Sequence, residues 1–112
     1  MYDPTHPALL KLIQLTVDAG KKHGIWTGVC GEMAGDPALV PLLLGLGVDE
    51  LSVAPPMLPQ IKHLIRHLKI AEARELAEAA LCAEASVDVL VRARALVQRA
   101  TPGLFESQPT GL

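Results

Sequence analysis

The side chain in this sequence best suited to chemistry is the thiol of Cys30. It follows the short apolar run 24–29 (GIWTGV) and opens the run 30–37 (CGEMAGDP). The first run predicts a buried strand over residues 25–29, and the glycines of the second run predict a turn. A thiol therefore lies where a strand ends and a loop begins, the edge at which α/β proteins usually carry their functional groups.

Two interpretations of this cysteine follow from its residue type. A thiol has a reference pKa of about 8.5 and is mostly protonated at neutral pH, and a cationic site lowers that pKa, so the group can act as a general acid and base. A cysteine is equally suited to be a small hydrophobic residue of the core. The residues alone leave both interpretations open.

Other polar or reactive residues have simpler interpretations. Glu32 is either a base or metal ligand or, as we favour, an acceptor that stabilises the loop. Asp36 precedes a proline and is expected to be a helix N-cap, whose side chain contributes about 1 kcal/mol to stability. His63 and His67 have the i, i+4 spacing of a zinc-binding helix, but no third ligand is near and their neighbours are basic, which favours a solvated face. Cys82 lies in an alanine-rich stretch and is expected in the core or at an interface.

Composition restricts the class of protein. The chain has 112 residues, of which 50% are apolar, so it is long enough for one domain with a core and too short for two. Its Lys and Arg residues are scattered and the formal net charge is −2, so no nucleic-acid partner is expected. No apolar run approaches the roughly 20 residues that cross a bilayer, and the N-terminus lacks a secretory signal. The two cysteines form no disulfide framework, which favours the reducing cytoplasm.

The pattern of apolar residues and helix caps predicts the elements. A first helix is expected over residues 7–23, with Thr5 as its candidate N-cap and Gly24 just beyond its end. Asp36 and Pro37 are expected to open a second helix, which is apolar nearly all round and therefore mostly buried. The remaining elements are a second strand over 48–53, helices over 57–67 and 71–83, a last helix capped by Ser86, and an irregular tail from Thr101.

The order helix–strand–helix–strand–helix–helix–helix is an α/β pattern with two parallel strands and about five helices. A strand–helix–strand unit places its strands parallel through a right-handed crossover. Two parallel strands are a poor sheet by themselves, because parallel sheets are buried on both faces within larger arrays. We therefore expect the chain to be incomplete alone, either as a piece of a larger α/β structure or as a subunit that builds one by oligomerising.

The run 30–36 (CGEMAGD) closely resembles a signature near the C-terminus of Enzyme I, the phosphoenolpyruvate–protein phosphotransferase family of the bacterial sugar phosphotransferase system. The likeness covers residues 2–98 and includes the runs 2–4 (YDP), 6–10 (HPALL), 26–29 (WTGV), 42–52 (LLLGLGVDELS) and 61–66 (IKHLIR). The tail after Thr101 departs from the family pattern. Pyruvate phosphate dikinase and phosphoenolpyruvate synthase also carry Cys-Gly at this point but differ in the residues that follow, and they stay as an alternative.

The resemblance implies a fold and a role for Cys30. Residues 1–100 would be the last quarter of a phosphoenolpyruvate-binding (β/α)8 TIM barrel, with its seventh and eighth strands, and residues 101–112 an irregular tail. Cys30 would be the proton donor to enolpyruvate. No cofactor or metal ligand is assigned to this segment, because the family's Mg²⁺ ligands, arginine clamp and phosphorylatable histidine lie upstream. The isolated segment is therefore expected to be inactive.

The resemblance also implies partners. These are phosphoenolpyruvate and pyruvate, a histidine phosphocarrier protein reached through the N-terminal domain, and a second copy of the chain, because Enzyme I dimerises through this domain. The alternative from another class is a non-catalytic dimerisation module, whose contact surface the apolar stripes of the last two helices would supply.

Overall fold

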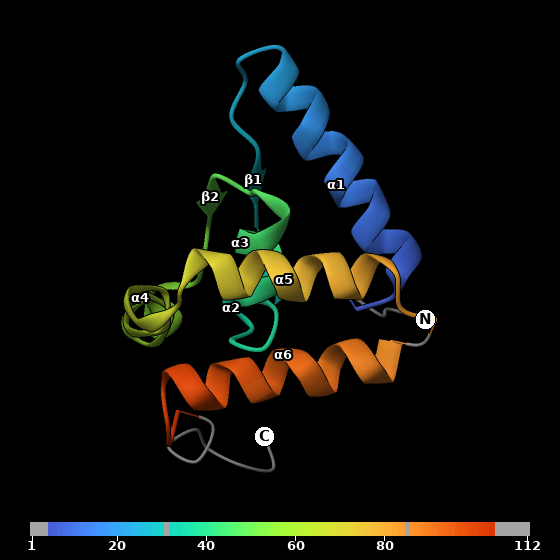
Figure 1. Cartoon of the computed structure of the whole chain (residues 1–112). Helices are drawn as coiled ribbons and strands as arrows, with labels where there is room; N and C mark the ends of the chain where they lie inside the picture. Colours follow the sequence, from blue (N-terminus) through green and yellow to red (C-terminus); the bar gives the residue numbers. More distant parts are fainter. Residues whose placement is uncertain (1–4, 31, 85, 105–112) are drawn as a thin grey trace.

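The structure, a computed structural model, describes residues 5–30, 32–84 and 86–104. Helices dominate it, and one pair of parallel strands accompanies them, as in a fragment of an α/β protein (Figure 1). The elements in chain order are α1 (Pro7–Lys22), β1 (Gly28–Val29), α2 (Glu32–Gly35), α3 (Val40–Leu46), β2 (Glu50–Leu51), the 3-10 helix η1 (Pro55–Met57), α4 (Leu58–His67), α5 (Ile70–Leu81) and α6 (Ser86–Ala100).

The two strands β1 and β2 pair in parallel, as the sequence predicts. Gly28 lies opposite Glu50, and Val29 lies opposite Leu51. The chain between the strands passes through α2 and α3, so the connection is a helical crossover. Parallel pairing brings the carboxyl ends of both strands to one edge of the sheet.

Both strands are shorter than the predicted 25–29 and 48–53. Within the described residues each strand has one neighbouring strand, so few of its backbone N–H and C=O groups can form hydrogen bonds within the sheet. Ile25 and Trp26 are 63% and 79% exposed, and the prediction that this stretch is buried on both faces is wrong for this chain.

Helix α1 begins at Pro7, as the sequence predicts, but its cap is not the predicted one. Its N-cap is His6, whose Nδ1 accepts a hydrogen bond from the amide of Ala8 at 3.0 Å, and Pro7 follows in the first turn. The prediction of Thr5 as the cap is therefore wrong. Thr5 is buried instead, and its hydroxyl donates to the carbonyl oxygen of Ser86 at 3.3 Å. The segment before α1 is thus bonded to the start of α6.

The second predicted helix is interrupted near its expected start. One helical turn, α2, replaces the expected glycine turn, and residues 37–39 form a turn before α3 begins at Val40. The prediction of Asp36 as the helix N-cap is wrong, because the N-cap of α3 is Leu39. The Asp36 side chain closes the turn instead, and its Oδ1 accepts from the amide of Ala38 at 3.0 Å. The later start has a physical cause: Pro41 has no amide proton, and it is tolerated in the first turn of a helix but not in its interior.

Helix α3 is the centre of the core, which confirms that the second predicted helix is mostly buried. Its side chains contact α1 on one side and α5 and α6 on another, and Figure 1 shows it behind α5. The positive φ of Gly47, +95°, ends the helix in the left-handed region. The largest cluster of buried side chains joins α1, α3, α5 and α6 through Leu10, Leu39, Leu42, Leu46, Leu76, Ala77, Ala80, Val89, Ala93 and Leu96.

Helices α3 and α5 come so close that one position between them accepts only glycine. A Cβ atom on Gly45 would overlap the carbonyl oxygen of Ala73 and would lie 2.9 Å from the Cβ of Ala77. The backbones therefore touch where Gly45 crosses α5, and small residues on α5 complete the contact.

The C-terminal half follows its predictions with shifted boundaries. The helix predicted over 57–67 is preceded by η1, the next helix runs over 70–81 rather than 71–83, and Ser86 is the first residue of α6. Figure 1 shows α5 and α6 running antiparallel, one below the other. Residues 101–104 are ordered against α6, because the hydroxyl of Thr101 donates to the carbonyl oxygen of Val97 and Leu104 is buried. The rest of the predicted tail, 105–112, lies outside the described residues.

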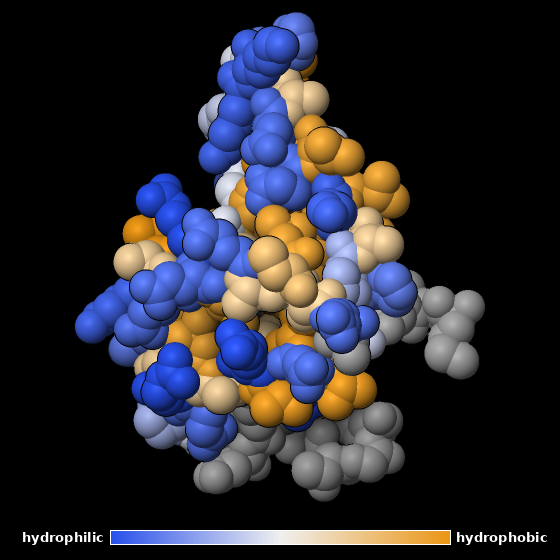
Figure 2. All heavy atoms as spheres, turned by 45° about the vertical axis from the view of Figure 1, so that its right-hand side comes forward, coloured by the Kyte–Doolittle hydropathy of each residue, from blue (hydrophilic) through white to orange (hydrophobic). Residues whose placement is uncertain are grey.

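Several apolar side chains stay at the surface. Figure 2 shows hydrophilic residues along the ridge at the top of the molecule, and apolar patches beside it and again near the base. Leu12 and Leu15 of α1, and Val87 and Val91 of α6, are between 61% and 68% exposed. None of the helices in the described part of the chain combines the length and apolar character of a membrane span.

We predict that Gly45→Ala destabilises the fold. Alanine is the better helix former by about 1 kcal/mol, but its methyl group must push α5 away, and such overpacking costs roughly 2 to 3 kcal/mol. Urea unfolding followed by circular dichroism measures the net loss. Gly35→Ala is the matched control, since its added methyl group would meet Met57 at 4.0 Å, an ordinary contact. Equal stability of the two variants would contradict the close crossing of α3 and α5.

Candidate functional site

Cys30 lies immediately beyond β1 and is exposed. The interpretation as a buried hydrophobic residue is therefore wrong for this chain, and the predicted place at the end of a strand is confirmed. The thiol lines a pocket of about 590 Å³. The other lining residues follow α2, β2 or η1 in the chain or belong to them, and they are Gly35, Asp36, Ser52, Val53, Ala54 and Met57.

The sheet has one covered face and one open face. Val29 and Leu51 pack against the buried side chains of Val17 from α1 and Leu43 from α3. Side chains alternate between the two faces of a strand, so the residues before and after this pair point the opposite way. The amide of Ser52 donates to the carbonyl oxygen of Val29 at 2.9 Å, which continues the parallel register beyond the strands.

We call the uncovered side of this sheet the open face, and its members are Gly28 and Cys30 from β1 and the loop after it, and Glu50 and Ser52 from β2 and the loop after it. All four are exposed. In the continued register Cys30 lies opposite Ser52, just as Gly28 lies opposite Glu50. The thiol and the hydroxyl therefore share one rim of the pocket, at the carboxyl ends of both strands.

The pocket offers few polar groups to a ligand. They are the Cys30 thiol, the Ser52 hydroxyl and the Asp36 carboxylate, and one oxygen of Asp36 is already engaged by the amide of Ala38. Asp36 is therefore mainly a turn-forming residue and not the helix N-cap that the sequence predicts. The Glu32 side chain lies outside what the structure describes, and the prediction of a loop-stabilising role stays a prediction.

Sequence reasoning missed Ser52 and Met57 as members of this pocket. Parallel strands end at the same edge, so the end of the second strand was expected near Cys30, but the predicted strand over 48–53 placed Ser52 inside the strand rather than after it. Met57 had no signal in the sequence, since it reaches the pocket from η1, a turn that apolar periodicity does not predict.

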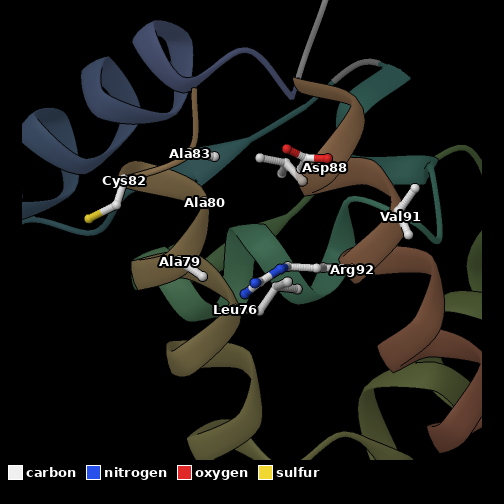
Figure 3. Close-up of a pocket in the computed structure, with 9 residues that line it drawn as sticks. Leu76, Ala79, Ala80, Cys82, Ala83, Asp88, Val91 and Arg92 are labelled. Atoms are coloured by element: carbon white, nitrogen blue, oxygen red, sulfur yellow. The ribbon is translucent and has the colours of Figure 1, made fainter. Parts of the chain in front are cut away.

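Cys82 is exposed at the C-terminal end of α5, so of its two predicted places the core is wrong, and a place at an interface stays a prediction. It borders a second hollow of about 530 Å³ between α5 and α6. Figure 3 shows Arg92 reaching from α6 toward Leu76 and Ala79, while the sulfur atom of Cys82 points away from them. The strand ends contribute nothing to this hollow, and its lining is mostly alanine, leucine and valine.

The histidine pair on α4 is a surface feature. His63 and His67 are exposed, their ring centroids are 4.4 Å apart, and the Nδ1–H of His67 donates to the carbonyl oxygen of His63 at 2.7 Å. The favoured interpretation as a solvated face is confirmed. Within the described residues no three His, Cys, Asp or Glu side chains are grouped so that they could hold a metal ion.

Comparison with known proteins places residues 1–70 within one family model, described as the PEP-utilising enzyme, PEP-binding domain. Among similar proteins, the phosphoenolpyruvate-protein phosphotransferase of Mycoplasma pneumoniae is 49% identical over 81 residues, which are 72% of this chain and 14% of that protein. The protein of the same name from Listeria monocytogenes is 48% identical over the same shares of the two chains. The one from Buchnera aphidicola is 42% identical over 90 residues, 80% of this chain and 16% of that protein. The chain thus spans a small part of the length of these curated relatives.

Both thiols are free and exposed, and we predict that both react in the native state. Ellman's reagent added to the folded chain should modify two thiols per molecule without denaturant. In Cys82→Ser one thiol should remain reactive, and in Cys30→Ser one should also remain. A Cys82→Ser chain that reacts only after unfolding would show that Cys30 is not accessible and would contradict the pocket described above.

Proposed function

The chain belongs to the PEP-utilising enzyme, PEP-binding domain family, and from this premise we propose that it is the C-terminal segment of an Enzyme I, the phosphoenolpyruvate–protein phosphotransferase of the sugar phosphotransferase system. Relatives with that name are 42% to 49% identical to it over most of the chain. This favours Enzyme I over the dikinase and synthase alternative. The relatives are much longer, so the activity belongs to the complete protein, and the segment alone is inactive.

We propose that residues 1–100 form the last quarter of a (β/α)8 barrel, with β1 and β2 as its seventh and eighth strands. The open face of the sheet supports this, because parallel strands are normally buried on both sides. Eight parallel strands close into a barrel whose interior is filled by side chains. The upstream six strands would cover the open face and complete the pocket at Cys30.

The observation that carries the proposal is the exposed Cys30 thiol in a pocket at the carboxyl ends of both strands. In (β/α)8 enzymes this end carries the active site. Phosphoenolpyruvate gives its phosphoryl group to a histidine of an upstream domain, which passes the group to a histidine phosphocarrier protein. The enolate of pyruvate is left behind, and the Cys30 S–H bond breaks as a C–H bond forms at the methylene carbon, leaving a thiolate.

Mg²⁺ in the complete enzyme would neutralise charge on the phosphoryl group. The described residues provide no ligand set for it, so its ligands are proposed to lie upstream and no step is assigned to it within this segment. Two free cysteines suit a reducing compartment, and we propose the cytoplasm.

We predict that Cys30→Ala in the full-length protein separates the two halves of the reaction. Phosphoryl transfer from phosphoenolpyruvate to the enzyme should survive, because the thiol takes no part in it. Exchange of the methyl protons of pyruvate with deuterated water, followed by proton NMR, should fall by a factor of about 100 or more, the usual contribution of a general acid or base. Cys82→Ala is the matched control and should keep both activities. Normal exchange in Cys30→Ala would rule out the role of the thiol.

We also propose that the complete enzyme forms a homodimer to which the C-terminal helices contribute. Val87 and Val91 lie one turn apart on α6 and are 68% and 62% exposed. Two exposed valines on one helix face are suited to burial against a partner. The same feature supports the alternative of a non-catalytic dimerisation module, which proton exchange at pyruvate would argue against.

Charged residues at these valines should weaken the dimer. We predict that Val87→Asp combined with Val91→Asp raises the dimer dissociation constant of the full-length protein at least about tenfold, because burying an unpaired carboxylate is costly. Sedimentation velocity over a range of concentrations measures the constant. Gln98→Glu adds a charge to an exposed position farther along α6 and should leave it unchanged. An unaltered dimer in the double variant would place the interface elsewhere.

A further inference from the structure

We propose that Glu50 is a positioning residue, whose carboxylate forms an ion pair inside the complete barrel with an Arg or Lys side chain of the upstream segment and holds that cation toward the phosphoenolpyruvate anion. This inference rests on the proposed function. It concerns a residue on the open face that the assigned chemistry does not use.

The first step is the place of Glu50 in the sheet. It lies in β2 opposite Gly28 and is exposed, and in the continued register the next pair on the same face is Cys30 with Ser52. Residues of one strand that share a face are about 6.6 Å apart along it. The Glu50 side chain therefore leaves the strand one layer below the thiol on the same face of the sheet, next to the pocket rather than in its lining.

The second step is the space beside it. Gly28 contributes no side chain to the open face, and an added Cβ there would lie 3.7 Å from the Cβ of Glu50, an ordinary contact. The position opposite Glu50 is thus unfilled rather than forbidden to a side chain. A side chain from a neighbouring strand can enter this space and meet the carboxylate.

The third step is charge. Among the described residues the Glu50 carboxylate has no salt-bridge or hydrogen-bond partner, and water can solvate it while the face is open. Closing a barrel over this face removes that water, and burying a charge without a partner is strongly unfavourable. A cation from the covering strands is the partner that such burial requires. The proteins that resemble this chain are long enough to supply it, since the aligned part is 14% of the first relative.

The fourth step is the charge of the substrate. Phosphoenolpyruvate carries a phosphate and a carboxylate, so an unpaired glutamate one layer below the reacting carbon would repel it. A guanidinium or ammonium group held between the two resolves this conflict, because it can bond to Glu50 on one side and to the substrate on the other. Glu50 then fixes the cation before the substrate arrives and reduces the reorganisation needed on binding.

The test uses the full-length protein and the steady-state rate of phosphoryl transfer from phosphoenolpyruvate. We expect Glu50→Gln to raise KM for phosphoenolpyruvate at least about tenfold, with a smaller change in kcat. Glu50→Asp keeps the charge on a shorter side chain and should have a KM between those of Glu50→Gln and the unaltered protein. Glu78→Gln, at an exposed position of α5, is the matched control and should behave like the unaltered protein.

The outcomes separate this inference from the proposed function. If the unaltered protein transfers no phosphoryl group from phosphoenolpyruvate, the proposed function fails. If it is active and Glu50→Gln keeps the original KM, the role of Glu50 alone is overturned. A raised requirement for Mg²⁺ at unchanged KM would make Glu50 a metal ligand and would also overturn it. Should Glu50→Gln not fold, an unchanged KM in Glu50→Asp overturns the proposal.

Discussion

The burial of α3 is the constraint from which the rest of this chain follows. Its apolar side chains must be covered on every side, and α1, α5, α6 and the two strands are arranged around it. Gly45 lets α5 approach until the two backbones touch, while Leu43 on another side covers Val29 and Leu51. The helix therefore fixes both the helical layer below it and the covered face of the sheet. What it cannot cover is the opposite face.

That asymmetry explains why the reactive groups are accessible. A chain of this length buries one face of two short strands, and the side chains on the open face are exposed to solvent. The carboxyl ends of both strands meet at one edge, where the Cys30 thiol and the Ser52 hydroxyl border a common pocket. The family match, and the small share of its relatives' length that the chain covers (14% of the first relative), support the proposal that this half-covered sheet belongs to a much larger protein.

Much of this architecture could be predicted from the sequence, and the failures have physical causes. Helical periodicity found α1 and α4 to α6 to within a few residues, and the strand–helix–strand order predicted parallel pairing. The cap of α1 was misassigned because a histidine side chain can accept the bond expected of Thr5. The start of α3 was predicted at Asp36 and Pro37, which together are typical of a helix start. The helix begins later because Pro41 is tolerated only in its first turn. Cys30 could be identified as a site residue from its sequence context. Ser52 could be identified only from the structure, because its place opposite Cys30 depends on the register of the two strands.

The hydrogen bond from Thr5 to Ser86 joins positions that are 81 residues apart. Together with the packing of α1 on α5, it means that the first helix has its full set of neighbours only after nearly the whole segment has been made. Contacts between distant positions slow folding, because the loop between them must be closed first. During synthesis on the ribosome, the apolar side chains of α1 therefore stay exposed to water or bound to a chaperone until the last helix has emerged.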